Sequence, residues 1–78
     1  MREQVRRFII DTFLYGEGTV KDDQPLFDSG IIDSLGFVKL LAFIEATFQV
    51  SMDMSEVGME SFNTLDEIVK TIEEKRKA

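Results

Sequence analysis

The stretch GIIDSLGFVKLLAFIEATF, residues 30–48, decides how this chain folds. Its larger apolar residues recur with the period of an α-helix and fall within one narrow arc of that helix. Asp33 stands just before the pattern, and aspartate is a preferred residue for capping a helix N-terminus. We therefore expect a helix over Ser34–Phe48, with a serine hydroxyl at its start. The stripe expected to face the core consists of Phe37, Leu40, Leu41, Ile44 and Phe48.

A second, smaller apolar arc runs along the same helix beside its serine end. Two interpretations fit this arc. A central helix can bury a wide face against several neighbours, or an exposed apolar strip can dock partner proteins. Periodicity alone supports both equally. The arc comprises Leu35, Val38 and Ala42, and its borders are Lys39, Glu45 and Ala46.

Helical periodicity also marks both ends of the chain. At the N-terminal end it predicts a helix from about Arg2 to Leu14, which Gly16 and Gly18 terminate. Near the C-terminal end, the segment Thr64–Glu67 has the S/T-x-x-E form of a capping box and opens the last helix. The first helix has Val5, Phe8, Ile9, Thr12 and Phe13 on one face, and the last has Leu65, Ile68, Val69 and Ile72.

The remaining segments connect these helices. Residues 15–32 form a connection so long that its apolar side chains are expected to hold it against the core. After the second helix, we expect methionines to fill gaps in the core and a short helix to follow at Met59–Phe62. The connection contains Leu26, Phe27, Ile31 and Ile32, and the methionine-containing loop has Val50, Met52 and Met54.

No segment alternates in the way that predicts a strand. The expected fold class is therefore all-α. We predict a small four-helix bundle with three longer helices, one short helix and a long first loop. The length favours a single domain over residues 1–78.

Composition excludes several kinds of chemistry. The chain has no cysteine and no histidine, which rules out disulfides, thiolate metal sites and a Ser-His-Asp triad. We therefore expect a protein that is not an enzyme. The acidic connection does not hold a calcium loop either, because its spacing does not match that of an EF-hand. The residues that invite that comparison are Asp22, Asp23, Asp28 and Gly30.

The distribution of charge narrows the choice of partners. The net charge is −6, and residues 17–67 contain eleven acidic side chains and two basic ones. Such a segment repels nucleic acid and attracts basic patches on proteins, although it also serves simple solubility. No apolar run reaches transmembrane length, and the N-terminus does not look like a signal peptide, so we expect a cytoplasmic location.

Ser34 is the residue best placed for modification by another enzyme. Unpaired N–H groups and the dipole of a helical first turn stabilise an anion such as a phosphodiester. A simpler interpretation is that this segment only caps a helix. Ser29 also follows an aspartate, but no helical stripe follows it, and Gly30 favours a turn there.

The chain resembles the acyl carrier proteins and the related peptidyl carriers over nearly its whole length. These proteins have a glycine-preceded D-S-L motif at the start of their second helix, here residues 30–35. The resemblance implies that a phosphopantetheinyl transferase moves 4′-phosphopantetheine from coenzyme A to Ser34, between the motif positions Asp33 and Leu35. The thiol of that arm then carries an acyl, polyketide or aminoacyl group as a thioester. Other shared features are Phe48, Val50, Met52 and the segment 62–64.

The sequence departs from fatty-acid carriers in its second helix. Their second helix is richly acidic, whereas here Gly36 follows the motif and Glu45 is the only acid of the helix. The difference argues against service to a housekeeping fatty-acid synthase, and the pattern resembles aminoacyl carriers, including those for D-alanine, and carriers of specialised pathways. We expect a stand-alone monomeric carrier, and the alternative is an unmodified acidic helical interaction domain. Loading and synthase enzymes would contact Val38, Lys39, Ala42 and Glu45.

Overall fold

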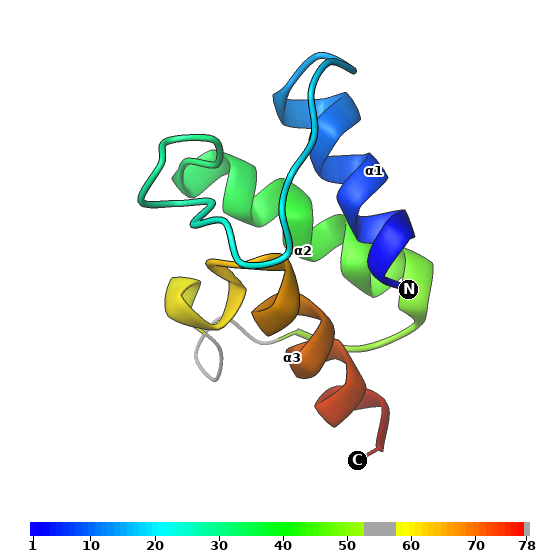
Figure 1. Cartoon of the computed structure of the whole chain (residues 1–78). Helices are drawn as coiled ribbons and strands as arrows, with labels where there is room; N and C mark the ends of the chain where they lie inside the picture. The colour runs from blue at the N-terminus through cyan, green and yellow to red at the C-terminus, as the bar shows by residue number, and fades with distance from the viewer. Residues whose placement is uncertain (53–57, 78) are drawn as a thin grey trace.

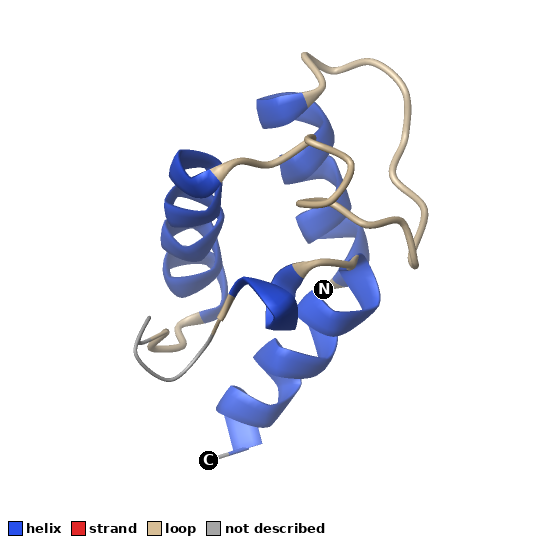
Figure 2. Ribbon diagram, turned by 90° about the vertical axis from the view of Figure 1, so that its left-hand side faces the viewer, coloured by secondary structure: helices blue, strands red, loops and turns tan. Residues whose placement is uncertain are grey.

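The computed structural model of the chain describes residues 1–52 and 58–77 (Figure 1). It contains the α-helices α1 (Arg2–Phe13), α2 (Ser34–Phe48) and α3 (Leu65–Lys77), and the 3-10 turn η1 (Met59–Phe62). No strand occurs in these described residues (Figure 2). The all-α architecture is therefore confirmed, with the predicted short helix present as a single 3-10 turn.

The end of α1 follows from its backbone conformation. The helix stops at Phe13, one residue earlier than predicted. Tyr15 and Gly16 then turn into the left-handed region, with φ angles of 56° and 80°. In this conformation the Gly16 N–H donates to the carbonyl of Ile10 at 2.9 Å, which closes the helix end.

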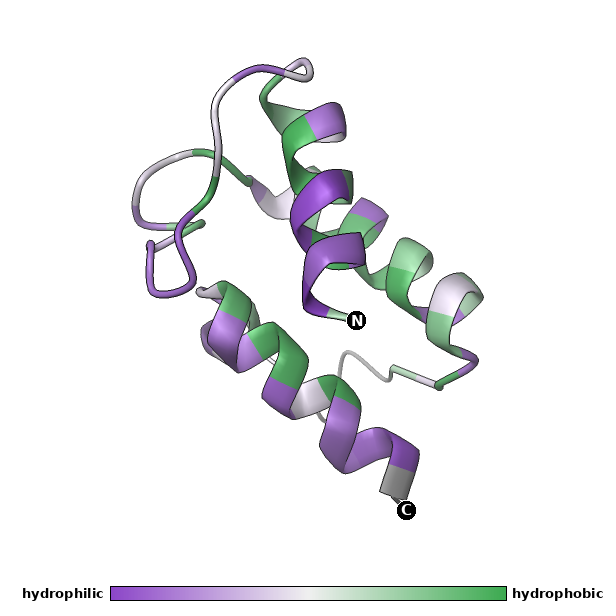
Figure 3. Cartoon of the chain, turned by 45° about the vertical axis from the view of Figure 1, so that its right-hand side comes forward, coloured by the Kyte–Doolittle hydropathy of each residue, from purple (hydrophilic) through white to green (hydrophobic). Residues whose placement is uncertain are grey.

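One hydrophobic core joins the three helices, η1 and the connection. Apolar residues lie on the faces that the helices turn toward one another, as α3 shows most clearly (Figure 3). The predicted stripe of α2 is confirmed, because four of its residues are buried and Phe48 packs partly buried against the core. Among the methionines, Met52 is buried as predicted, Met59 is exposed, and Met54 lies outside the described residues. The four buried stripe residues are Phe37, Leu40, Leu41 and Ile44.

The connection between α1 and α2 passes the start of α3 before it returns to α2 (Figures 1 and 2). The Asp66 N–H donates to the carbonyl of Asp22 at 3.0 Å, which attaches the connection to the first turn of α3. Val20, Leu26 and Ile32 are buried, so the connection is held on the core as expected.

Ion pairs from α1 hold the same segment from the other side. The Arg6 guanidinium donates to the carbonyl of Val20 and to Asp22 Oδ1. The hydrogen bond with Asp22 raises the pKa of Arg6 above its ordinary value. Arg2 pairs with the Asp66 carboxylate at 2.5 Å. The connection and the start of α3 are thus both attached to α1.

Candidate functional site

The candidate site is the N-terminal end of α2. Asp33 is extended, and its Oδ1 accepts a hydrogen bond from the Gly36 N–H at 2.7 Å. This bond satisfies one of the amides that a helix start leaves unpaired, and it confirms Asp33 as the N-cap. Ser34 is the first residue of the helix and is exposed, and within the described part of the chain its hydroxyl has no hydrogen-bond partner. The hydroxyl is therefore open to another enzyme.

The electrostatics of this helix start favour an anion. The first turn of α2 contains no acidic residue. The Asp33 carboxylate faces the positive end of the helix dipole, and it already accepts the Gly36 N–H. The amides of Ser34 and Leu35 have no carbonyl four residues back within the helix, and they remain donors for an incoming group.

Gly36 makes the close packing of this site possible. A Cβ on Gly36 would lie 2.7 Å from Cε1 of Phe13 in α1 and 2.9 Å from Cγ2 of Ile32. Both distances are shorter than carbon atoms tolerate, so a larger residue at this position would push the side chains of Phe13 and Ile32 away from the start of α2. The sequence marks Gly36 only as a departure from fatty-acid carriers and does not reveal this packing role.

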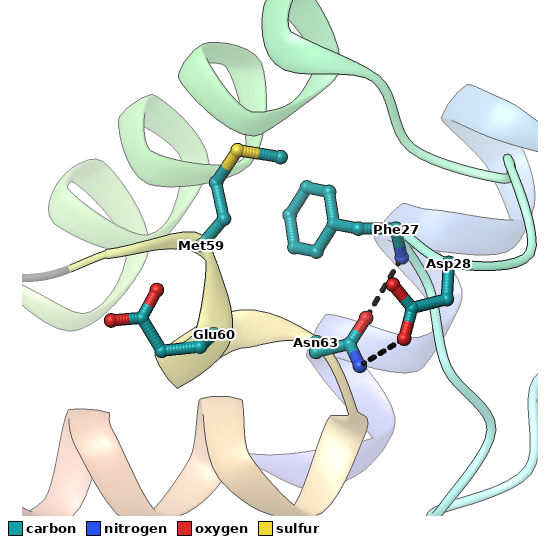
Figure 4. A pocket seen from close by; sticks show the side chains of 5 residues that line it. All are labelled: Phe27, Asp28, Met59, Glu60 and Asn63. Atoms are coloured by element: carbon teal, nitrogen blue, oxygen red, sulfur yellow. Dashed lines mark hydrogen bonds between the residues drawn. The ribbon is translucent and has the colours of Figure 1, made fainter.

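Asn63 fixes the connection beside the site. Its Oδ1 accepts the Phe27 N–H at 3.0 Å, and its Nδ2 donates to Asp28 Oδ2 at 3.3 Å (Figure 4). Its backbone carbonyl also accepts the Leu26 N–H at 2.6 Å. These contacts join segments 36 residues apart, so no local pattern in the sequence could have indicated them.

The second apolar arc of α2 points into solvent. Leu35 is 74% exposed and Val38 is 50% exposed, and Ala42 and Lys39 are also exposed. Burial of this arc against neighbouring elements is therefore wrong, and the docking interpretation remains. Glu45 is exposed too, but its Oε2 accepts the Met52 N–H at 3.0 Å and so stabilises the chain after α2.

The competing serine lies in a different setting. The Ser29 hydroxyl donates to the carbonyl of Leu26 at 3.4 Å, within a turn that Gly30 continues with φ 82°. Ser29 therefore lacks the unpaired helical amides that surround Ser34.

Among the described residues, no group of three acidic side chains gathers as metal ligands, and no described helix has the length and apolar character that crossing a membrane requires.

A small all-α domain that displays an exposed serine at the start of its second helix has the architecture of a phosphopantetheine-bearing carrier. The chain belongs to the family described as "Phosphopantetheine attachment site", whose model matches residues 3–72. The family consists of carrier proteins that are not themselves catalytic, and the match implies a 4′-phosphopantetheine prosthetic group.

Relatives with curated names agree with this family. The chain is similar to the D-alanyl carrier proteins of Streptococcus pyogenes serotype M5 (strain Manfredo), serotype M49 (strain NZ131) and serotype M1. Each is 44% identical over 52 residues, which cover 67% of this chain and 66% of the relative. The matched stretch thus spans slightly less than two thirds of these relatives.

The residues at the start of α2 fit the prosthetic group that the family implies. Ser34 has an exposed hydroxyl that could accept the group, and the first-turn amides can donate to a phosphodiester. When bound, the group supplies a thiol, a function that this cysteine-free chain lacks. The exposure of Ser34 would leave such an arm free to leave the surface of the helix bundle.

Proposed function

We propose that Ser34 carries 4′-phosphopantetheine and that the chain is a stand-alone carrier of an aminoacyl thioester. The exposed serine at a helix start without first-turn acids is the observation that carries this proposal. In the modification, the Ser34 oxygen loses its proton and forms a bond to the phosphorus that bears pantetheine in coenzyme A. The pyrophosphate bond breaks, and adenosine 3′,5′-bisphosphate leaves.

Intact mass spectrometry tests the attachment. The unmodified protein is incubated with coenzyme A and a broad-specificity phosphopantetheinyl transferase. We expect the wild type and Ser29→Ala to gain one phosphopantetheine, and Ser34→Ala to gain none. A wild type without any gain would instead favour an unmodified acidic interaction domain.

The relatives named as D-alanyl carriers favour D-alanine as the cargo over fatty acyl and polyketide groups. The modified protein is incubated with ATP, D-alanine and a D-alanine-activating enzyme, and in parallel with a fatty-acyl-loading enzyme. We expect a mass gain of one alanyl group, which hydroxylamine removes because it cleaves thioesters. Loading with fatty acid alone would overturn the aminoacyl assignment.

The exposed arc of α2 is the proposed contact surface for these enzymes. Leu35, Val38 and Ala42 supply apolar area beside Ser34, and Lys39 borders them with a positive charge. Glu45 completes the proposed face, although its carboxylate also accepts the Met52 N–H. We further propose that the carrier works as a cytoplasmic monomer in which residues 1–78 form one domain.

A further inference from the structure

A pocket beside the candidate site has no role in the carrier chemistry described above. It lies between the connection and η1, and its volume is about 290 Å³ (Figure 4). This volume is just below the usual range for ligand-binding cavities, roughly 300–1,000 Å³, so it suits a small group rather than a long acyl chain. The residues that line it are Phe27, Asp28, Met59, Glu60 and Asn63.

The lining combines an aromatic ring, a thioether and negative charge. The Phe27 ring and the Met59 side chain face each other across the pocket, and Asp28 lies beside Asn63 (Figure 4). Asn63 uses its amide group for Phe27 and for Asp28 Oδ2, which leaves Asp28 Oδ1 without a hydrogen-bond partner in the described part of the chain. None of the lining residues is a lysine or an arginine.

Glu60 supplies the second carboxylate in the lining, at the edge of the pocket. Glu60 Oε1 and Oε2 lie 2.6 and 2.5 Å from the point that a Cβ on Gly58 would occupy, so this side chain folds back over Gly58. Its carboxylate points away from Asp28 (Figure 4). Asp28 is therefore the carboxylate available to an occupant, and Glu60 adds negative potential at a distance. The pocket thus offers an aromatic ring and a negatively charged hydrogen-bond acceptor, and its lining contains no lysine or arginine. This combination suits an organic ammonium group.

Chain connectivity places this pocket close to Ser34. The Ile32 N–H donates to the carbonyl of Leu26 at 3.0 Å, and Phe27 directly follows Leu26. Ser34 comes two residues after Ile32, and two residues span no more than about 7 Å even when extended. A flexible arm on Ser34 would thus start close to the backbone of Phe27, which lines the pocket.

We propose that this pocket binds the ammonium end of the aminoacyl cargo, with Asp28 as its counter-ion and the Phe27 ring beside it. The proposal rests on the function proposed above, because the cargo reaches the pocket only on an arm attached to Ser34. When the aminoacyl group occupies the pocket, this small, charged cargo lies against η1. An uncharged acyl group of the same size gains no ion pair there.

The test compares two cargoes that differ only in the ammonium group. A phosphopantetheinyl transferase attaches amide-linked analogues, in which nitrogen replaces the thioester sulfur, so that neither cargo is hydrolysed. One analogue carries D-alanyl and the other carries propionyl. Backbone amide chemical shifts of Phe27, Asp28 and Asn63 are measured by NMR, relative to the protein that bears the unloaded arm.

We expect the alanyl cargo to shift these amides about two- to fivefold more than propionyl, the population change that an exposed ion pair typically supports. Asp28→Asn should reduce the alanyl effect to the propionyl level. Asp23→Asn removes the same charge elsewhere in the connection and should leave the effect unchanged.

The outcomes separate this inference from the proposed function. Equal shifts for both cargoes, or an alanyl effect that survives Asp28→Asn, would overturn the pocket assignment while the attachment to Ser34 stands. A protein that gains no mass from either analogue contradicts the attachment itself. Circular dichroism checks the fold of Asp28→Asn, and we expect the helical signal to match that of the wild type.

Discussion

The helices α2 and α3 both begin at a side-chain cap, but their starts are completed differently. At α3 the Thr64 hydroxyl accepts the Glu67 N–H at 3.1 Å and donates to the Glu67 carboxylate at 3.1 Å. At α2 the cap comes from Asp33, and the hydroxyl of Ser34 stays exposed. The predicted capping box of α3 is thus present in altered form, because Glu67 bonds the threonine hydroxyl.

The two starts also differ in charge. α3 has Asp66 and Glu67 in its first turn, and Asp66 pairs with Arg2. α2 has no acid in its first turn. We call the start of α3 closed, because its hydroxyl and dipole are satisfied within the chain, and the start of α2 open. A helix start with free amides and no first-turn acid is the better place for an anion such as a phosphodiester, so the contrast favours α2 over α3 as the site we propose.

The largest change in unfolding free energy is expected from a substitution at Gly36, where α1 packs against the open start of α2. Gly36→Ala introduces a Cβ against Phe13 and Ile32, and we expect it to lower the free energy of unfolding by about 1–2 kcal/mol, the overpacking cost less the gain in helix propensity. Urea denaturation measures this change. Phe13→Leu in the Gly36→Ala background should recover part of the loss, since it removes the ring that the Cβ meets. A Gly36→Ala variant as stable as the wild type contradicts the packing role.

The caps themselves provide the next comparison. Asp33→Ala and Thr64→Ala each remove one cap, and each should cost about 1 kcal/mol of unfolding free energy. Only Asp33→Ala should also slow phosphopantetheine transfer, because Asp33 fixes the backbone beside Ser34. The rates at which Asp33→Ala and Thr64→Ala gain the mass of phosphopantetheine are compared at equal protein concentration. Equal slowing by Thr64→Ala would show that general stability, rather than the open start, limits transfer.

The features of these helices that depend on local pattern could be predicted from the sequence. Asp33 as the cap, the start of α2 at Ser34 and the core stripe of α2 all follow from residues a few positions apart. The contacts of Gly36 and Asn63 could not be predicted in this way, because their partners are distant in sequence and meet only in the folded chain. For the same reason, periodicity could not decide whether Leu35 was buried.

An acidic residue in the first turn of α2 should compensate the dipole of this helix, as Asp66 and Glu67 do at the closed start of α3. Leu35 is exposed, so Leu35→Glu adds a first-turn acid without removing core packing. We expect the unmodified protein to gain about 0.3–1 kcal/mol in unfolding free energy, because the acid compensates the helix dipole. The unfolding free energy of the modified protein should rise less, because the negative phosphodiester already compensates the positive end of the helix dipole. Leu35→Gln is the uncharged control, and identical gains before and after modification contradict an anion at this helix start.

The smallest effect on stability is expected along the exposed arc. Val38→Asp should change the unfolding free energy by no more than about 0.5 kcal/mol, because Val38 is half exposed. It should nevertheless weaken cargo transfer from the loading enzyme, since the arc loses apolar contact area. Thr47→Asp, at an exposed position near the other end of α2, serves as the matched control. Unchanged transfer by Val38→Asp would exclude this arc as the docking surface.

Fragment-ion mass spectrometry of the modified wild-type protein identifies the residue that carries phosphopantetheine. After treatment with coenzyme A and the transferase, the protein is digested and the residue that bears the added phosphopantetheine is located. We predict that the group is found on Ser34 alone. The same group on Ser29, or on Thr64 at the closed start of α3, would contradict attachment at the open start of α2.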